Sequence, residues 1–419
     1  MIRALGQSGN VWREIRRSRL KAIILAAGEG SRMRPLTYTR PKVMLPLANK
    51  PILEHLLIEA NKAGIRQFIF VVGYRDEQVR DYFGSGDKWG VSIDYSTQRR
   101  QLGTADAIKM VDGLIDGNFL VINGDIVVNQ KDISSLTSRS ENTLSVFEVE
   151  DTRDLGVVEV KGDRIVHIYE KTERPPSHMA NVGLYLFTPD IFDAVSRTSE
   201  SLRGEYEITD ALQLMIEQGH HISYQEISYW LDLSYPWDLL TANESLLAGI
   251  EPQNLGEVEE NVVVKDVVSI GKNTVVRSGS YIVGPVIIGQ DCDIGPNCYI
   301  RPSTSIGDNC HIGSAVEVKN SIIMKDSKIP HHNYVGDSII GEGCNFGAGT
   351  KIANLRLDKK DITVAGIDTK RRKLGAIIGD RVETGINVGI NVGSMIGNNT
   401  HIGPGAIVSG VILPDSRIF

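Results

Sequence analysis

The 419-residue chain has no apolar stretch long enough to span a membrane and no excess of positive charge. A membrane-spanning helix needs roughly 20 consecutive apolar residues, and no window of the sequence approaches that length. The formal net charge of -7 argues against non-specific nucleic-acid binding, although local basic clusters can still hold small anions. We therefore expect a soluble, cytoplasmic protein that acts on small molecules and binds neither a membrane nor a nucleic acid.

A basic leader followed by an apolar run opens the sequence and raises the question of a secretory signal. The run at residues 22–27 is too short for the apolar core of a signal peptide, and Glu29 and Arg32 follow it at once. We interpret this run as a buried β-strand, preceded by an N-terminal extension at residues 1–20.

The first half of the chain alternates short apolar runs with a helical pattern. KAIILAA, QFIFVVG and NFLVING are typical of strands, and the last two are nearly uninterrupted, as in buried parallel strands. Between the first two runs, PILEHLLIEANKAG has helical apolar spacing, with Pro51 expected at the first helical position and Gly64 as terminator. The alternation predicts an α/β domain over residues 21–250, with a mostly parallel sheet and helices on both faces.

From residue 258 the apolar period changes to six. Aliphatic residues recur every six positions from Val258 to Val318, and the period returns over residues 340–352 and 378–408. This is the hexapeptide signature of a parallel β-helix, in which each hexad forms one face of a three-sided coil. We expect this fold over residues 258–419, after a linker at residues 251–257.

The chain has only four cysteines, and all of them follow the packing period. Each lies four residues after an inward-pointing aliphatic residue, in a slot that elsewhere holds threonine or valine: Cys292, Cys298, Cys310 and Cys344. A metal site or a set of disulfides would not follow the packing phase so closely. We expect buried free thiols with no redox role.

The stretch LAAGEGSRMRPLTYTRPK, residues 25–42, places glycines and cations directly after the first strand. The backbone N–H groups of a glycine-rich turn can face an anion there, and Arg32 and Lys42 would supply the countercharge. Many βα corners need glycine for geometry alone, so the turn by itself supports either interpretation.

Six ordered motifs make the first half resemble the sugar-1-phosphate nucleotidyltransferases. The glycine-rich turn with its Pro-Lys is followed by QRRQLGTADA (98–107), NGD (123–125), YEK (169–171), NVGLYLF (181–187) and WLD (230–232). The resemblance implies a Rossmann-like nucleotidyltransferase domain. There a sugar-1-phosphate oxygen attacks the α-phosphate of a nucleoside triphosphate and pyrophosphate leaves.

This reaction brings two anions together, so it needs charge neutralisation. Mg²⁺ prefers oxygen ligands and keeps several waters, and one or two carboxylates suffice to hold it. Asp125, at the end of a buried strand where α/β sheets bind ligands, is the first expected metal ligand, and Asp232 is the second. The alternative for Asp125 is a turn carboxylate at a strand end.

The resemblance also assigns roles to other residues of this domain. It implies that Arg32 and Lys42 are the catalytic cations at the triphosphate and the leaving pyrophosphate. The implied nucleotide-binding residues are Leu25, Ala26, Ala27, Gly28, Gln98, Gly103, Thr104, Asn123 and Gly124. The implied sugar-phosphate residues are Gly156, Glu170, Lys171 and Asn181, although Glu170 and Lys171 could be an exposed charge pair.

The six-residue period breaks around residues 326–337 and 355–375, where we expect loops that leave the coil and carry function. Residues 300–356 resemble the acetyltransferase half of the bifunctional N-acetylglucosamine-1-phosphate uridyltransferase/glucosamine-1-phosphate acetyltransferase family, in its archaeal type. The resemblance implies a left-handed parallel β-helix and a homotrimer with the acetyl-transfer site between neighbouring coils. The basic run RRK at 371–373 contacts CoA phosphates or is simply solvated.

Acetyl transfer from acetyl-CoA requires a sugar amine that has lost its proton, and a histidine with a pKa of roughly 6.5 suits the general base. In the family the base precedes a Tyr-x-Gly-Asp stretch, which selects His331 and leaves His332 as the alternative. Further substrate and acetyl-CoA contacts are implied for Arg301, Lys319, Tyr334, Asn345, Ala348 and Asn354. For Arg301 and Lys319 the alternative is a solvated face of the coil.

We expect a bifunctional enzyme that N-acetylates glucosamine-1-phosphate and couples the product to UTP, giving UDP-N-acetylglucosamine. One alternative is a glucose-1-phosphate thymidylyl- or uridylyltransferase, using dTTP or UTP, whose acetyl site serves another amino sugar. A mannose-1-phosphate guanylyltransferase would not need His331, Tyr334 and Asn354. A non-catalytic regulatory scaffold should have lost the cations and carboxylates that are all present here, namely Arg32, Lys42, Asp125, Lys171 and Asp232.

Overall fold

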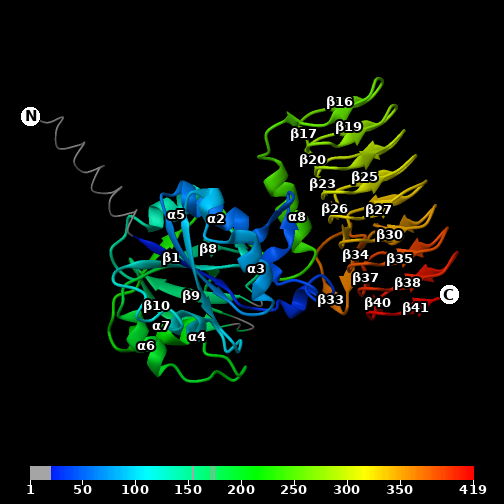
Figure 1. Ribbon diagram of the computed structural model, residues 1–419. Coiled ribbons are helices and arrows are strands. Elements are labelled where there is room, and N and C mark those ends of the chain that lie inside the picture. Colours follow the sequence, from blue (N-terminus) through cyan, green and yellow to red (C-terminus); the bar gives the residue numbers. More distant parts are fainter. Residues whose placement is uncertain (1–19, 153–154, 171, 173–174) are drawn as a thin grey trace, which may run out of the picture. The chain divides into compact units, whose positions relative to one another are not determined.

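The computed structural model describes residues 20–152, 155–170, 172 and 175–419, and these residues divide into two units (Figure 1). The first unit contains the described residues up to Glu29 and Ile52–Asp232, and the second contains Gly30–Pro51 and Leu233–Phe419. All but the last residue of the expected N-terminal extension lies outside the described residues. The segment 30–51, which carries Arg32 and Lys42, groups by its contacts with the second unit.

The first unit is built on a mixed nine-stranded sheet in the order β5-β4-β1-β6-β11-β8-β12-β10-β9. Its strands are β1 (Lys21–Ala26), β4 (Gln67–Val72), β5 (Ser92–Thr97), β6 (Phe119–Asn123), β8 (Thr143–Glu148), β9 (Gly156–Lys161), β10 (Arg164–Glu170), β11 (Met179–Phe187) and β12 (Ser223–Glu226). The first four are mutually parallel, which confirms the three strands expected from the apolar runs. β11 runs antiparallel to β6, so only this half of the sheet is parallel throughout.

Helices cover both faces of this sheet (Figure 1). They are α2 (Ile52–Lys62), α3 (Asp76–Phe83), α4 (Thr104–Lys109), α5 (Gln130–Leu136), α6 (Ile191–Arg197) and α7 (Ile208–Glu217), with a short 3-10 turn η3 (Asp87–Trp89). Residues of α4, α6 and α7 share one core with Ile23 and Val121 of the sheet. The expected helix is α2, but it begins at Ile52, because Pro51 pairs in a small hairpin of β2 (Pro46–Leu47) and β3 (Lys50–Pro51).

The second unit contains three parallel sheets. Successive strands of the chain belong to the first, second and third sheet in turn, as in a three-sided coil. The first sheet comprises β14 (Gln253–Asn254), β17 (Val268–Ile270), β20 (Val286–Ile288), β23 (Thr304–Ile306), β26 (Ile322–Ile323), β29 (Ile339–Ile340), β34 (Ala376–Ile378), β37 (Ser394–Ile396) and β40 (Val411–Ile412). The second comprises β15 (Glu257–Val258), β18 (Val275–Val276), β21 (Asp293–Ile294), β24 (His311–Ile312), β27 (Lys328–Ile329), β30 (Asn345–Phe346), β35 (Glu383–Thr384), β38 (His401–Ile402) and β41 (Arg417–Ile418). The third comprises β16 (Val263–Lys265), β19 (Tyr281–Val283), β22 (Tyr299–Ile300), β25 (Glu317–Lys319), β28 (Tyr334–Gly336), β31 (Lys351–Ile352), β36 (Gly389–Ile390) and β39 (Ile407–Val408).

The aliphatic residues at the six-residue period form the core of the coil. Ile282, Ile294 and Ile300 are completely buried, and they belong to one cluster with residues of all three sheets. This arrangement is consistent with a parallel β-helix and confirms the expected inward direction. Val264 is an exception, 43% exposed, because it belongs to the first strand of its sheet and has a stacked neighbour on one side only.

The first expected break, at residues 326–337, is wrong as a loop, because the coil continues through it. Tyr334 pairs with Glu317, and Lys328 pairs with His311, in the regular parallel register. The inward residues after Val318 are Ile323, Ile329 and Val335, so the turn between Val318 and Ile323 has five residues in place of six. A second five-residue step leads from Val335 to Ile340, so two shortened hexads displaced the count without interrupting the fold.

The second expected break is confirmed as an excursion from the coil. Residues 355–375 leave after β31, form an antiparallel hairpin of β32 (Thr363–Val364) and β33 (Ile367–Asp368), and return at β34. A bridge between Leu355 and Lys373 closes the base of the excursion. Ile362 and Val364 are buried, so the hairpin is packed against the rest of the unit.

The cysteines are buried free thiols, as expected. All four are at most 3% exposed, and burial raises the pKa of the Cys344 thiol to about 12. A thiol that keeps its proton at neutral pH is a poor nucleophile and a poor metal ligand. Within the described part of the chain, helices are all too short or too polar to cross a bilayer.

Candidate functional sites

The predicted nucleotide-binding residues of the first unit gather at the carboxyl ends of its parallel strands. The N–H of Gly124 donates to the carbonyl of Leu25 (2.9 Å), and the N–H of Tyr74 donates to that of Ala27 (3.0 Å). Gly28 follows at once, exposed, with open space where a Cβ atom would be. Ligands of α/β sheets bind at this edge, so the placement fits the expectation.

Gln98 and Gly103 form a rigid corner beside this edge. The buried Gln98 amide donates to Asp106 Oδ2 (2.7 Å) and to the Gly103 carbonyl (3.1 Å). Gly103 has a φ of 108°, and a Cβ there would lie 2.5 Å from the Tyr206 carbonyl oxygen. The Thr104 hydroxyl accepts from the Ile208 N–H (2.9 Å). Because Gln98 Nε2 donates within the protein, a contact of Gln98 with a base would use its oxygen as acceptor.

The two predicted metal ligands are brought close by a short antiparallel pair. β7 (Ile126–Val127) follows Asp125, and β13 (Leu231–Asp232) pairs with it so that Asp232 stands opposite Ile126. Both carboxylates are half-buried. Among the described residues no group of three or more His, Cys, Asp or Glu side chains could hold a metal.

The residues present fit Mg²⁺, which is satisfied by one or two carboxylates when phosphates and waters complete its shell. A buried oxygen supports this fit: Asn123 Oδ1, two residues before Asp125, has no hydrogen-bond partner. Gly183 explains how Asn123 is packed, since it has a φ of 81° and a Cβ there would lie 2.3 Å from Asn123 Nδ2. Gly183 was missed, although it lies within the NVGLYLF motif.

Three of the predicted sugar-phosphate residues come together on neighbouring strands. Glu170 on β10 stands opposite Gly156 on β9, and a Cβ on Gly156 would lie 3.0 Å from Glu170 Oε2 and 3.8 Å from Asn181 Cβ. The Asn181 amide donates to the Tyr185 hydroxyl (2.9 Å). Lys171, the fourth, lies outside the described residues.

An ion network beside Glu170 was not anticipated from the sequence. Arg203 donates to Glu170 Oε1 (2.9 Å) and to Glu207 Oε1 (2.6 Å). Burial raises the pKa of Glu207 to about 7, against the opposing charge of Arg203. Burial also raises the pKa of Tyr185, to which the charges of Glu170 and Asp125 add. Glu170 therefore sits in a structured, charged environment, which disfavours the alternative of a solvated charge pair.

The two predicted catalytic cations lie in the segment 30–51, within the second unit. Gly30 has a φ of 73°, and a Cβ there would lie 2.7 Å from Lys42 Cβ, so glycine is required for the approach of the lysine stem. Thr37 Oγ1 donates to the Gly30 carbonyl (3.0 Å). The exposed Arg32 guanidinium stands over the Tyr235 ring, 5.5 Å from its centroid.

His331 and Ala348 occupy the same corner of consecutive coils in the second unit. The Gly349 N–H donates to the His331 carbonyl (3.0 Å), and the His331 side chain is exposed. His332 has a φ of 54°, in a slot that holds Asn297 and Asn387 on other coils with φ of 54° and 56°. His332 thus occupies a left-handed corner that asparagine fills on other coils, and its side chain is exposed like that of His331.

Asn354 and Lys319 contact Asp337, which was not among the predicted site residues, and Asn354 also bonds to Tyr334. Asn354 Nδ2 donates to Asp337 Oδ2 (2.5 Å) and to the Tyr334 hydroxyl (3.1 Å), and Lys319 Nζ lies 3.1 Å from Asp337 Oδ2. Burial raises the pKa of Tyr334. The partner of Lys319 is a buried carboxylate, and this environment differs from the solvated face of the coil that was the alternative for Lys319.

Arg301 and Asn345 are placed differently from this cluster. Arg301 is stacked above Lys319 in the third sheet and pairs with Glu317 (2.8 Å). Asn345 lies exposed on β30 of the second sheet, on the other side of the His331 corner from Tyr334. Within one chain it is not part of the Asp337 cluster.

The basic run at residues 371–373, which follows the hairpin in the excursion, is only partly exposed. Arg371 donates to Thr241 Oγ1 (2.8 Å) of α8 (Asp238–Leu247). Burial lowers the pKa of Arg371. Arg372 and Lys373 are exposed.

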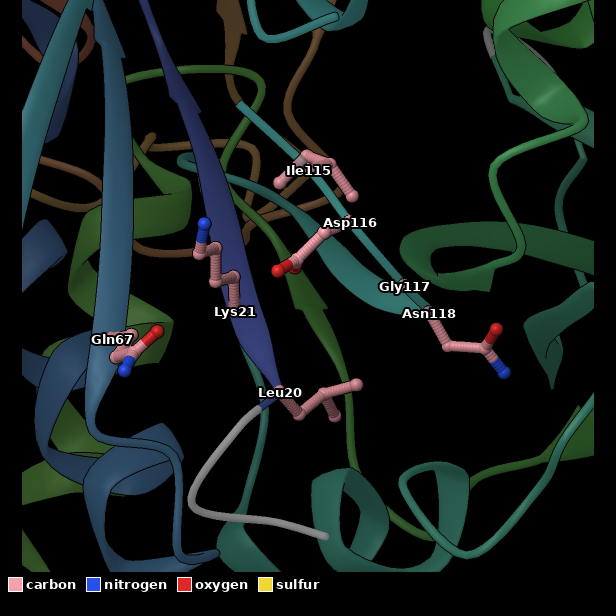
Figure 2. Close-up of a pocket in the computed structure, with 7 residues that line it drawn as sticks. All are labelled: Leu20, Lys21, Gln67, Ile115, Asp116, Gly117 and Asn118. Carbon is pink, nitrogen blue, oxygen red and sulfur yellow. The ribbon is translucent and has the colours of Figure 1, made fainter. Parts of the chain in front are cut away.

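A separate pocket of about 600 Å³ lies at the amino ends of β1 and β4, away from the predicted residues (Figure 2). It is lined by Leu20, Lys21, Gln67, Ile115, Asp116, Gly117 and Asn118. None of these is a predicted site residue, and Gly28 and Asp125 follow the opposite, carboxyl ends of the strands.

Two family models match the chain, one over its first half and one over the coil. Residues 21–249 match the nucleotidyl transferase family, and residues 282–419 match the GMPPB C-terminal domain. A crystal structure of a putative glucose-1-phosphate thymidylyltransferase from Bacillus anthracis is 28% identical with a TM-score of 0.51, covering 56% of this chain and 98% of its own. The first unit thus has the Rossmann-like fold of nucleotidyltransferases, and the protein is an enzyme of the transferase class.

Two curated relatives match nearly the whole chain. The bifunctional sugar-1-phosphate nucleotidylyltransferase/acetyltransferase of Sulfurisphaera tokodaii is 42% identical over 399 residues, 93% of this chain and 97% of its own. The bifunctional protein GlmU of Methanocaldococcus jannaschii is 42% identical over 405 residues, 96% of this chain and 97% of its own. The chain belongs to the family of bifunctional sugar-1-phosphate nucleotidylyltransferase/acetyltransferases.

Proposed function

We propose that this enzyme makes UDP-N-acetylglucosamine in two reactions, N-acetylation of glucosamine-1-phosphate by acetyl-CoA and then uridylyl transfer from UTP. The observation that carries the proposal is the presence of two separate polar clusters on one chain. One is the carboxylate pair Asp125 and Asp232 at the sheet edge, and the other is the Asp337 cluster of the coil, which also carries His331. Each cluster suits one of the two reactions.

For uridylyl transfer, the strand-end residues from Leu25 to Gly28, together with Gln98, Gly103 and Thr104, bind the nucleotide. Asn123 and Gly124 complete this set. Asp125 and Asp232 hold Mg²⁺, which when bound neutralises the phosphates. Arg32 and Lys42 contact the triphosphate and the departing pyrophosphate. The protein need not form a covalent bond to the substrate, because catalysis of phosphoryl transfer depends on positioning the reactants and neutralising their charge.

Gly156, Glu170, Lys171 and Asn181 bind the sugar phosphate. Asn181 is fixed by two hydrogen bonds, its amide donating to the Tyr185 hydroxyl and its oxygen accepting from the Gly183 N–H (3.3 Å), and further lone pairs of this oxygen and of the Glu170 carboxylate accept from sugar hydroxyls. The close approach at Gly156 supports this role, because a Cβ there would lie 3.0 Å from Glu170 Oε2 and would displace the carboxylate slightly.

For acetyl transfer, His331 takes the proton from the sugar amine, so that the nitrogen lone pair attacks the thioester carbonyl and CoA leaves as a thiol. Asn354, bonded to Asp337, and Tyr334, bonded to Asn354, orient the sugar, while Arg301 and Lys319 bind its phosphate. The backbone of Ala348 contacts acetyl-CoA. Asn345 on the neighbouring face suits a site completed by an adjacent protomer, in a homotrimer of left-handed coils.

A glucose-1-phosphate thymidylyl- or uridylyltransferase is the second candidate, because a solved relative of the first unit is a putative glucose-1-phosphate thymidylyltransferase. Turnover of purified enzyme with N-acetylglucosamine-1-phosphate or glucose-1-phosphate, each with UTP or dTTP, tests the choice. We expect the highest kcat/KM for N-acetylglucosamine-1-phosphate with UTP. A higher value for glucose-1-phosphate would reverse the assignment, and absence of acetyl-CoA-dependent acetylation of glucosamine-1-phosphate would remove the second activity.

A further inference from the structure

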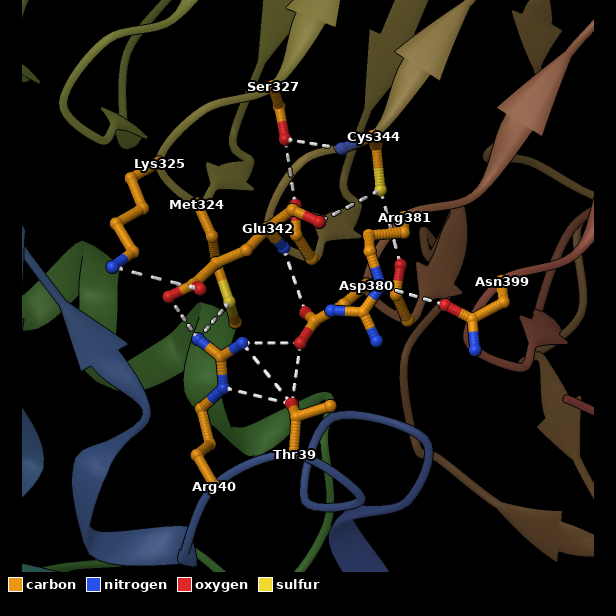
Figure 3. Close-up of polar contacts among 12 residues, drawn as sticks. Thr39, Arg40, Met324, Lys325, Ser327, Glu342, Cys344, Asp380, Arg381 and Asn399 are labelled. Carbon is orange, nitrogen blue, oxygen red and sulfur yellow. Dashed lines mark hydrogen bonds and ion pairs between the residues drawn. The ribbon is translucent and has the colours of Figure 1, made fainter. Parts of the chain in front are cut away.

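The segment 30–51, which carries Arg32 and Lys42, is bonded to the coil through a buried arginine. Arg40 is 7% exposed and forms ion pairs with Glu342 and with Asp380, its Nη2 lying 2.5 Å from Asp380 Oδ2 (Figure 3). Thr39 Oγ1 donates to the same Asp380 oxygen (2.5 Å), and Met324 Sδ lies 3.7 Å from Arg40 Nη1. The Asp380 side chain is only 2% exposed.

Glu342 and Asp380 occupy the same corner on successive coils. Asp380 Oδ1 accepts from the Glu342 N–H (2.8 Å), and the Arg381 N–H donates to the Glu342 carbonyl (2.8 Å). The 355–375 excursion separates these two coils in the sequence. A guanidinium whose two terminal nitrogens each meet a different carboxylate fixes both position and orientation, which an ammonium cannot do. Arg40 therefore fixes the position of the segment 30–51 relative to two successive coils.

A second attachment lies at the other end of the segment. The fully buried Asn243 of α8 accepts from the Ala48 N–H (2.8 Å) and from Ser305 Oγ (2.7 Å), and it donates to the Ser303 carbonyl (3.1 Å). Asn49 Nδ2 donates to the Ile306 carbonyl (2.6 Å). Lys42, in the short turn η2 (Lys42–Met44), lies between the two attachments and only two residues from Arg40.

We propose that Arg40, held by Glu342 and Asp380, is a positioning residue for nucleotidyl transfer, so that the coil is a working part of that reaction as well as the carrier of acetyl transfer. The inference rests on the proposed uridylyl transfer and on the role of Lys42 and Arg32 in it. Charge stabilisation depends steeply on geometry, and a displacement of about 1 Å can cost roughly 100-fold in rate. Loosening the segment should therefore lower kcat for nucleotidyl transfer without affecting His331 chemistry.

The test uses the full-length enzyme and both assays. Arg40→Lys and Arg40→Met are expected to lower nucleotidyl-transfer kcat by about 10-fold to 100-fold, with Lys the milder change, while acetyl-transfer kcat stays within about twofold. Glu342→Gln, which leaves the Asp380 pair intact, should have an intermediate effect. Arg277→Ala is the matched control, because Arg277 also pairs with coil carboxylates, Asp293 and Glu259, but at an exposed position. It should leave both rates unchanged.

Removal of Arg40 alone leaves Asp380 as a buried charge without its partner, so lost activity could follow from lost stability. The double variant Arg40→Met/Asp380→Asn removes both charges. We expect its thermal midpoint to recover toward that of the wild type while nucleotidyl-transfer kcat stays low, and hydrogen exchange of peptides covering residues 30–51 to be faster than in the wild type. Recovery of kcat together with the midpoint would show a purely structural role and overturn the inference.

The wild-type assay separates this inference from the proposed function. If the wild-type enzyme fails to release pyrophosphate with any sugar phosphate and nucleoside triphosphate pair, the proposed function is wrong. If the wild type is active and Arg40→Met retains its nucleotidyl-transfer kcat, only the positioning role is wrong.

Discussion

The two candidate sites are assembled from the chain in opposite ways. In the coil, Lys319 and Asn354 reach Asp337 from 18 and 17 residues away, which is one turn of the repeat. At the sheet edge, Asp125 and Asp232 stand together only because β13 returns to pair with β7 after nearly the whole first unit has been built. The period of the sequence is sufficient to form the first site, whereas the second depends on the long-range topology of a mixed sheet.

This difference predicts how each site fails. A stacked site depends on its neighbouring coils, so a substitution should act locally and leave the other activity intact. The sheet-edge site depends on elements that are distant in sequence, so no neighbouring residue can replace a carboxylate that is lost there. Single substitutions, with both activities measured on the same preparation, therefore test this difference between the sites.

Asp125→Ala should have the largest effect. Loss of a metal ligand removes several kcal/mol of transition-state stabilisation, which corresponds to a fall in nucleotidyl-transfer kcat of about 10³-fold or more. Acetyl transfer should be unchanged. The measurement is Mg²⁺-dependent pyrophosphate release, with the exposed Asp94→Ala on β5 as the control. Near-normal release by Asp125→Ala would reject the metal assignment.

His331→Ala should lower acetyl transfer by about 10²-fold or more, the usual contribution of a general base. Nucleotidyl transfer of supplied N-acetylglucosamine-1-phosphate should be unaffected. His332→Asn is the matched control, because asparagine holds the same left-handed corner at Asn297 and Asn387. Should the two variants behave in the reverse order, the roles of the neighbouring histidines would be exchanged.

Local patterns were enough to predict much of the fold. The strands β1, β4 and β6, helix α2 and the inward-pointing residues of the coil each follow from a period within a few turns of chain. The break at residues 326–337 was wrongly predicted because a strict six-residue count does not allow for the five-residue steps after Val318 and Val335. The helix start at Ile52 was shifted because Pro51 is taken up by a tertiary hairpin.

The partners that define the site chemistry were less accessible from sequence. Arg40 meets Glu342 and Asp380 across 302 and 340 residues, and no local pattern links them. Arg203 and Glu207 show helical spacing, but nothing in the sequence connects them with Glu170. Asp337 was visible in the Tyr-x-Gly-Asp stretch, yet its role as a shared anchor depends on the stacking of β25, β28 and β31.

Gly103→Ala should destabilise the first unit by about 1–3 kcal/mol, because a positive φ and a close backbone contact act together. Gly113→Ala has a comparable φ, 82° against 108°, but open space around the added Cβ. The difference between the two variants in chemical denaturation therefore isolates the contact with Tyr206. Equal destabilisation would mean that the backbone at Gly103 yields, and that the corner beside Gln98 is less rigid than the structure indicates.

The smallest expected effect is a pH dependence of stability arising from Glu207. Its pKa is raised by burial from 4.5 to about 7, so between these values the folded state binds more protons than the unfolded state. By linkage, this group lowers the free energy of unfolding as pH rises from about 5 to 7, and the loss is complete above the folded pKa. Glu207→Gln removes the titration, so the thermal midpoint of the variant should fall less than that of the wild type over this interval. Because the coil lies outside this network, acetyl-transfer activity should show the same pH profile in both proteins; parallel midpoint curves for wild type and variant would instead show that Arg203 keeps Glu207 ionised throughout.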